Sequence, residues 1–127
     1  MQTHILLVDD STTIRTSVAS CLRNASFRVT EAVNGRDALD KLALIAASGE
    51  RVSLVLTDVN MPEMDGITLI RRLREGPWRF VPILVLSTET DRAIVEAGKS
   101  AGASGWLGKP FEPRQLLGAI EKLVWSR

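Results

Sequence analysis

The side chains best suited to chemistry in this sequence are three carboxylates, each placed just after a short apolar segment. They are Asp9 and Asp10, which follow residues 5–8, and Asp58, which follows residues 54–57. If two of these carboxylates lie about 4 Å apart, their repulsion costs on the order of 4 kcal/mol at an effective dielectric constant of about 20. A proton or a cation must relieve that repulsion. Oxygen ligands with no His or Cys nearby favour Mg²⁺ over zinc or copper.

Two more polar side chains, Ser87 and Lys109, also lie at the ends of apolar segments. A pocket that combines acids, a lysine and a hydroxyl suits phosphoryl transfer, because positioning and charge stabilisation account for most of that catalysis. A simpler interpretation is that Asp58 only caps the helix that follows it. The other two carboxylates, Asp9 and Asp10, favour the chemical interpretation because they leave their own apolar segment in the same way.

Five apolar or alternating segments predict the strands that must position these residues. They are Ile5–Val8, Phe27–Ala32, Val52–Thr57, Val81–Ser87 and Gly105–Leu107. Each is followed by a segment in which apolar residues recur at helical spacing. This alternation predicts an α/β fold with a doubly wound parallel sheet, right-handed crossovers and helices on both faces. Because parallel strands point the same way, the carboxylates, the serine and the lysine should meet at one edge of the sheet.

Capping and turn residues mark the beginnings of the five expected helices. These beginnings are at Ser11, at Asn34-Gly35, at Gly66, at Thr90 or Asp91, and near Pro113. Gly98 lies inside the fourth helix, where it should weaken the helix by about 1 kcal/mol relative to alanine.

Length and composition predict one domain, residues 1–127, with no output domain. Sixteen basic and fifteen acidic side chains give a formal net charge of +1, so no nucleic-acid partner is expected. No apolar run approaches the roughly 20 residues that span a bilayer, and the N-terminus does not resemble a signal peptide. Cys21 is the only cysteine, which excludes an internal disulfide. A cytoplasmic monomer that contacts no membrane is expected.

Five motifs follow one another along the chain: Asp9-Asp10, Asp58 with Asn60-Met61-Pro62, Asp65-Gly66, Ser87, and Lys109-Pro110-Phe111. Together they resemble the receiver domain of two-component response regulators, and the chain as a whole is similar to the single-domain, chemotaxis-type (CheY-like) regulators. The resemblance covers essentially the whole chain. It implies a flavodoxin-like (βα)5 fold with the strand order 2-1-3-4-5.

The resemblance also implies a metal site and a phosphoacceptor. Asp58 would take a phosphoryl group from a histidine kinase. Asp10 would bind Mg²⁺ directly, Asp9 mostly through water, and Asp58 and the backbone carbonyl of Asn60 would complete the site. Lys109 would pair with the acyl phosphate.

The resemblance further implies a switch. Ser87 would donate a hydrogen bond to the phosphoryl group, and Trp106 would then move from solvent into the space behind the fourth strand. Asn60 and Glu89 would tune how fast the phosphoryl group is lost. The Lys109-Pro110 peptide bond is expected to be cis, as in the family.

The function implied is that of a phosphorylation-dependent switch, in chemotaxis or motility, that catalyses only its own phosphorylation and dephosphorylation. A downstream protein would dock on the face that carries Arg92, Val95, Trp106 and Lys122. The flagellar motor, a pilus motor, and a partner kinase or phosphatase remain open as targets. The alternatives are a phosphate sink, a docking receiver that is not phosphorylated, and, more remotely, a flavodoxin-like flavin protein. Asp9-Asp10 argue against the last, because they would repel a flavin phosphate.

Overall fold

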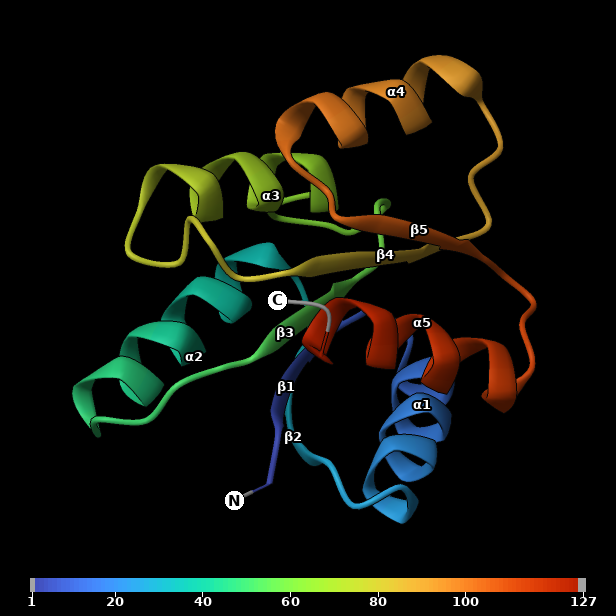
Figure 1. Ribbon diagram of the computed structural model, residues 1–127. Coiled ribbons are helices and arrows are strands. Elements are labelled where there is room, and N and C mark those ends of the chain that lie inside the picture. The colour runs from blue at the N-terminus through green and yellow to red at the C-terminus, as the bar shows by residue number, and fades with distance from the viewer. Residues whose placement is uncertain (1, 126–127) are drawn as a thin grey trace.

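Strands and helices alternate along the chain in the computed structural model, which describes residues 2–125 (Figure 1). The strands are β1 (His4–Val8), β2 (Arg28–Ala32), β3 (Leu54–Thr57), β4 (Ile83–Ser87) and β5 (Gly105–Gly108). The helices are α1 (Thr12–Asn24), α2 (Gly35–Ala47), α3 (Gly66–Glu75), α4 (Arg92–Ala101) and α5 (Pro113–Trp125). The predicted alternation is confirmed.

All strands pair in parallel, in the order β2-β1-β3-β4-β5. The chain first moves outward from β1 to β2, and then crosses back to β3 and continues to β4 and β5. In open α/β sheets, ligands bind in the crevice outside the carboxyl ends of the strands where the direction of winding reverses, which here is between β1 and β3. The strand order implied by the resemblance is confirmed, and Asp9 and Asp58 leave their strands at this point of reversal.

Helices cover both faces of the sheet, with α1 and α5 on one face and α2, α3 and α4 on the other (Figure 1). Side chains of β1 alternate between the two cores: Leu6 and Val8 face α2 and α3, whereas Ile5 and Leu7 face α1 and α5. The strands β1, β3 and β4 are buried along their whole length, which explains their continuous apolar sequences.

Two strands begin later than the sequence predicts. β3 begins at Leu54 rather than Val52, and β4 begins at Ile83 rather than Val81. Pro82 has no N–H to donate to a ladder, so regular pairing of β4 starts after it. Val52 and Val81 lie outside the strands but are buried in the core between the sheet and the helices. Their apolar side chains therefore suggested strand residues in the sequence. The remaining strand ends, His4, Arg28 and Gly108, lie within one residue of the prediction.

Side-chain caps begin the first four helices. The caps are Ser11, Asn34, Asp65 and Asp91, and each accepts a hydrogen bond from a backbone N–H of the first turn. Such bonds replace some of those that the first turn cannot make within the helix. Asp91, rather than Thr90, caps α4. Among residues 2–125, no helix has the length and apolar character needed to cross a membrane.

A partly buried arginine fixes the end of α4 to α3. Arg74 donates from Nε and Nη2 to the carbonyl of Gly102, at 3.1 and 2.7 Å. Its Nη1 donates to the carbonyls of Arg79 and Val81, at 3.0 and 2.6 Å. Gly102 has φ +120°, and a Cβ there would lie 2.8 Å from the Arg74 Nε. Two of these hydrogen bonds therefore join the C-terminal end of α3 to that of α4, and the other two hold the segment that leads from α3 to β4.

The only histidine of the sequence is buried in β1. His4 Nε2 lies 2.7 Å from the hydroxyl of Thr30 on β2. Burial, together with the positive charge of Arg28, lowers the pKa of His4 below its ordinary value. The unfolded chain therefore takes up a proton on His4 before the folded protein does.

This pKa shift predicts that acid weakens the fold in a defined pH window. Above about pH 6.5, the usual pKa of histidine, the contribution of neutral His4 to stability is fully present, and it is lost as the pH falls below that value. We expect the urea midpoint to fall between pH 7.5 and pH 5.5. In His4→Phe, which does not titrate, the midpoint should stay nearly constant over that range. An equal fall in both proteins would contradict this assignment.

Candidate functional site

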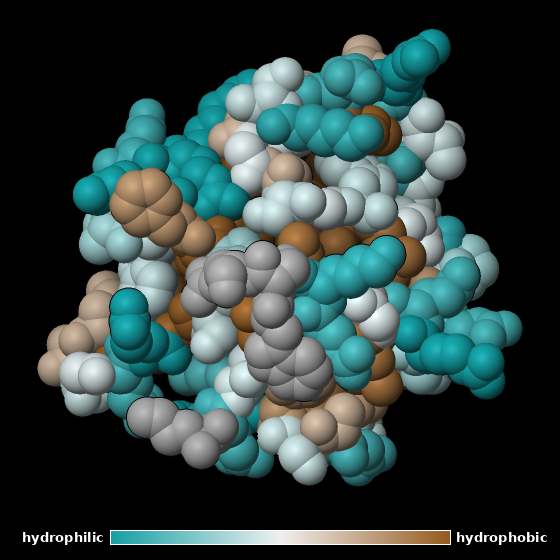
Figure 2. All heavy atoms as spheres, in the orientation of Figure 1, coloured by the Kyte–Doolittle hydropathy of each residue, from teal (hydrophilic) through white to brown (hydrophobic). Residues whose placement is uncertain are grey.

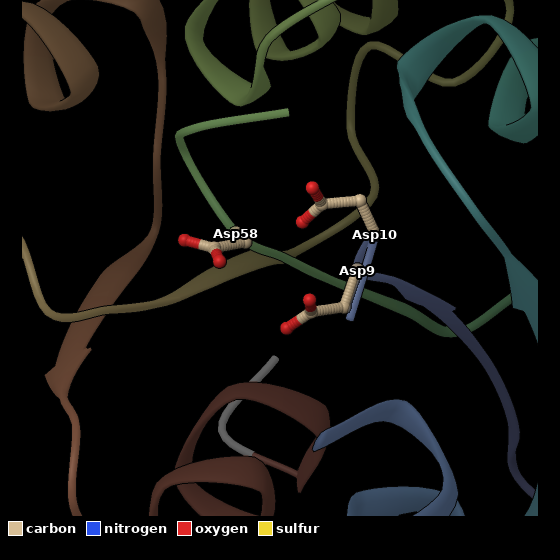
Figure 3. A group of neighbouring side chains, drawn as sticks. All are labelled: Asp9, Asp10 and Asp58. Carbon is tan, nitrogen blue, oxygen red and sulfur yellow. The ribbon is translucent and has the colours of Figure 1, made fainter. Parts of the chain in front are cut away.

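The ends of β1 and β3 bring the three carboxylates together. Val8 and Thr57, the last residues of these strands, are paired in register, so the residues after them are neighbours. Carboxylate oxygens of Asp9, Asp10 and Asp58 all lie within 4.8 Å of one another, and the three groups gather at the strand ends (Figure 3). The predicted acidic cluster is therefore confirmed as an arrangement of side chains.

Lys109 bridges two of these carboxylates. Its Nζ lies 3.0 Å from Oδ2 of Asp9 and 3.1 Å from Oδ2 of Asp58. The exposed fractions of the three side chains are 9%, 4% and 17%, so the ion pairs are largely shielded from water. Lys109 reaches the site because β5 ends beside β4: its N–H donates to the Ser87 carbonyl at 2.9 Å. The Lys109-Pro110 peptide bond is cis, as expected.

The acids keep Lys109 charged in spite of its burial. Burial alone lowers the pKa of Lys109, but the hydrogen bond to Asp9 and the charge of Asp58 outweigh it. The pKa of Lys109 therefore lies above the ordinary value for lysine. At neutral pH the site holds an ammonium group next to Asp58.

Backbone groups orient the two bridged carboxylates. Oδ1 of Asp58 accepts a hydrogen bond from the Val59 N–H at 2.7 Å, and Oδ1 of Asp9 accepts one from the Ser11 N–H at 2.9 Å. Arg15 donates from Nη1 to the Asp9 carbonyl at 2.7 Å, a contact that the sequence did not predict. Asp58 does not cap α3, because Asp65 does. The interpretation of Asp58 as a simple cap is wrong.

A glycine allows α3 to pack against the backbone of Asp58. The N–H of Gly66 donates to the Val59 carbonyl at 2.8 Å, and a Cβ on Gly66 would lie 2.0 Å from the Asp58 carbonyl oxygen. No side chain fits in that space. Position 66 in the Asp65-Gly66 motif therefore requires glycine because of its distance to Asp58, a contact that the sequence alone does not reveal.

Ser87 lies at the same edge but takes part in a different set of hydrogen bonds. Its buried Oγ accepts a hydrogen bond from the Glu89 N–H at 2.9 Å. Oε1 of Glu89 in turn accepts one from the N–H of Asp91, the cap of α4, at 2.8 Å. In this structure the Ser87 hydroxyl therefore supports the loop before α4 and makes no hydrogen bond to Asp58.

The donor set suits a hard divalent cation. Three carboxylates converge, and neither Asp10 nor the exposed Asn60 carbonyl accepts a hydrogen bond from a described residue. Both can therefore offer oxygen to an ion that also keeps some of its water, as Mg²⁺ does. The role of the Asn60 carbonyl as a metal ligand stays a prediction.

Trp106 is partly buried and packs against the core on the side of α4. The expectation that its indole lies in solvent is wrong, because Gly98 of α4 leaves room for the ring. Among the other residues expected on the docking face, Arg92 and Lys122 are exposed and Val95 is partly buried. They lie on α4 and α5, which flank β5, and hydrophobic atoms reach the surface between these helices (Figure 2).

Known proteins are similar to this chain in sequence and in fold. The family model of the response regulator receiver domain matches residues 5–121. The transcriptional regulatory protein GltR of Pseudomonas aeruginosa is 37% identical over 121 residues, 94% of this chain and 48% of that protein, so the chain spans about half of its length. A chemotaxis protein CheY homolog of Campylobacter jejuni is 35% identical over 122 residues, 94% of this chain and 91% of that one. The solved structure of Vibrio cholerae CheY4 has a TM-score of 0.87 at 38% identity, covering 97% of this chain and 99% of that one.

The close packing of Gly66 predicts that even one added methyl group disturbs the site. In Gly66→Ala, either α3 or the Asp58 backbone must move, and overpacking of this kind costs about 1–3 kcal/mol. We expect a lower urea midpoint and a smaller response to Mg²⁺. Gly118→Ala, in an exposed part of α5 where a Cβ meets nothing within 4 Å, is the matched control and should lower neither. Equal behaviour of the two variants would contradict the packing argument.

The acidic cluster predicts that Mg²⁺ stabilises the protein. A cation that binds only the folded state raises Tm, and this one also relieves repulsion among the carboxylates. Asp10→Asn should lose most of that rise. The control is Asp40→Asn, which removes an exposed carboxylate of α2 outside the cluster and should keep the full rise. Equal Tm values with Mg²⁺ and with a chelator, measured on the unmodified protein, would exclude the site.

Proposed function

Because the chain belongs to the response regulator receiver domain family, we propose that it is a phosphorylation-dependent signalling switch with Asp58 as the phosphoacceptor. One observation carries the proposal: Lys109 bridges Asp58 and Asp9 in a shielded crevice that also receives Asp10. A carboxylate in that position is oriented by its backbone and stands next to a fixed positive charge. Those are the requirements of phosphoryl transfer, in which positioning and charge stabilisation do most of the work.

The proposed reaction transfers a phosphoryl group from a phosphohistidine of a histidine kinase. A carboxylate oxygen of Asp58 forms a bond to phosphorus while the P–N bond breaks, and the electron pair of that bond remains on the imidazole. The product is an acyl phosphate on Asp58. Lys109, already 3.1 Å from Asp58, stabilises the negative charge that spreads over the phosphoryl oxygens. The Val59 N–H holds Oδ1 of Asp58 and so fixes the plane of the carboxylate.

The proposed cofactor is Mg²⁺, held by Asp9, Asp10, Asp58 and the Asn60 carbonyl. When bound, it neutralises charge on the phosphoryl group during transfer. Asp9 has two tasks in this arrangement, since Oδ2 pairs with Lys109 while Oδ1 accepts from the Ser11 N–H. Its position in the cluster is therefore set by the protein before any ion arrives. Ser87 is proposed to turn from Glu89 toward the phosphoryl group, and Glu89 and Asn60 to tune its loss.

A groove beside the site is proposed as the surface where the kinase delivers its histidine. The groove has a volume of about 490 Å³ and is largely apolar. Lys109 lines it, together with Ile14 and Val18 of α1 and Phe111. Because the donor histidine must reach Asp58, the kinase has to cover the protein surface next to Lys109. An apolar groove at that place supports contact there.

The proposed output is the docking of a downstream protein on the face formed by α4, β5 and α5. Arg92, Val95, Trp106 and Lys122 lie on these elements, and Trp106 and Lys122 line one cavity of about 230 Å³. The CheY relatives support chemotaxis or motility as the process. A phosphate sink remains the second candidate, since it needs the same pocket. The family match removes the support for a flavin protein.

We further propose that the chain acts as a cytoplasmic receiver domain and as a monomer. Its only catalysis would be its own phosphorylation and dephosphorylation, which follows from the proposed role of Asp58 as the phosphoacceptor. Signal would then leave the protein through changed docking rather than through a chemical product.

The proposed acceptor is tested with radiolabelled acetyl phosphate and Mg²⁺. Asp58→Asn should abolish labelling, since the amide oxygen is a poor nucleophile. The urea midpoint should change little, because Lys109 keeps its ion pair with Asp9 and repulsion with the other two carboxylates is removed. Asp40→Asn should be labelled normally. Labelling that persists in Asp58→Asn would remove this residue from its role. An unmodified protein that takes up no label from acetyl phosphate or from a histidine kinase would favour the docking receiver that works without phosphate.

A further inference from the structure

The space beside one glycine of α4 is filled by an aromatic ring of β5. A Cβ built on Gly98 would lie 2.6 Å from Cζ3 of Trp106, and 3.5 Å from Cε3 and from Cη2. These atoms belong to the six-membered ring of the indole, so the end of that ring rests against the helix backbone. Gly98 is the only buried residue of α4. The glycine therefore forms the bottom of a seat for Trp106.

Space, rather than backbone conformation, is what position 98 requires. Gly98 lies inside a helix, where alanine is the more stable residue. Its φ is not among the positive values that call for glycine, unlike that of Gly102. A methyl group in this seat would overlap the indole, and Trp106 could not yield easily because it packs against the core.

The other end of α4 is linked to Ser87. Glu89 donates its N–H to Ser87 Oγ and accepts at its carboxylate from the Asp91 N–H. Asp91 in turn caps α4, accepting from the Ala93 N–H at 2.9 Å. Ser87 is thus connected through Glu89 to the cap of α4, and the same helix carries the seat of Trp106 seven residues after that cap.

We propose that Gly98 is the positioning residue of Trp106, and that through this contact α4 links Ser87 to the docking face. The inference rests on the proposed function, since it supposes that a phosphoryl group draws the Ser87 hydroxyl away. The Glu89 N–H then loses its acceptor and the cap of α4 is loosened. The helix tilts, the seat at Gly98 moves, and Trp106 moves with it.

A first experiment tests the seat without any phosphoryl group. Alanine at an interior helix glycine normally raises Tm, so Gly118→Ala should raise it by about 3–5 °C. Gly98→Ala should lower Tm instead. In a background of Trp106→Val, which removes the ring, Gly98→Ala should raise Tm about as much as Gly118→Ala does. Equal rises for Gly98→Ala and Gly118→Ala in the unmodified background would overturn the proposal.

A second experiment tests the link to Ser87. With Trp78 and Trp125 replaced by Phe, the emission comes from Trp106, since the sequence has three tryptophans. Saturating beryllofluoride with Mg²⁺, a mimic of the acyl phosphate, should change that emission. Gly98→Ala should shift the emission before the mimic is added and remove at least half of the change, whereas Gly118→Ala should do neither.

Labelling from acetyl phosphate separates this inference from the function on which it rests. Gly98→Ala should be labelled as well as the unmodified protein, because Asp58 is not touched. A full emission change in Gly98→Ala, with normal labelling, would overturn the relay while leaving the proposed function intact. Loss of labelling in the unmodified protein would overturn the proposed function, and the Tm comparison would still decide whether Gly98 seats Trp106.

Discussion

The ammonium group of Lys109 is held between Asp9 and Asp58, and much of the structure serves to keep it there. Removing one partner of a buried ion pair typically costs 3–5 kcal/mol, because the remaining charge is left without compensation. The two ion pairs join Lys109 to Asp9, which lies 100 positions earlier in the chain, and to Asp58, which lies 51 positions earlier. Only a sheet in which β1, β3 and β5 run parallel can supply them from one edge. One positive charge nevertheless faces three carboxylates, so the crevice keeps an excess of negative charge that a divalent cation can balance.

The position of this crevice could be predicted from the sequence for a simple physical reason. Apolar segments indicate buried strands, and when these strands are parallel, the residues that follow each strand lie at one edge of the sheet. Asp58 and Lys109 could therefore be placed together without any knowledge of distances. The first residues of β3 and β4 could not be predicted in this way, because Val52 and Val81 are buried by packing against helices and not as members of a strand. Hydrophobicity reports burial, and it does not report which element causes it.

Contacts between elements could not be predicted in this way. Gly66 and Gly98 each look like a weak helix residue in the sequence, yet each leaves room for a group from another element: the Asp58 carbonyl in one case and the Trp106 ring in the other. The partial burial of Trp106 follows from the second contact, which contradicts the solvent position expected for it. A missing side chain has no pattern of its own, so only the packed structure reveals what occupies the space.

The two hydrogen bonds that Arg74 donates to the Gly102 carbonyl have a mechanical consequence for α4. They tie the C-terminal end of α4 to α3, while the N-terminal end of α4 depends on the hydrogen bonds of Glu89 and Asp91. Any rearrangement of α4 would therefore be a pivot about the fixed end rather than a translation. The helix has ten residues and a rise of about 1.5 Å per residue, so a tilt of about 10° would move its free end by about 2.6 Å. The displacement grows with distance from the fixed end of α4, so Arg92 would move farther than Gly98. A small change at the crevice would therefore cause its largest displacement in the first turn of this helix.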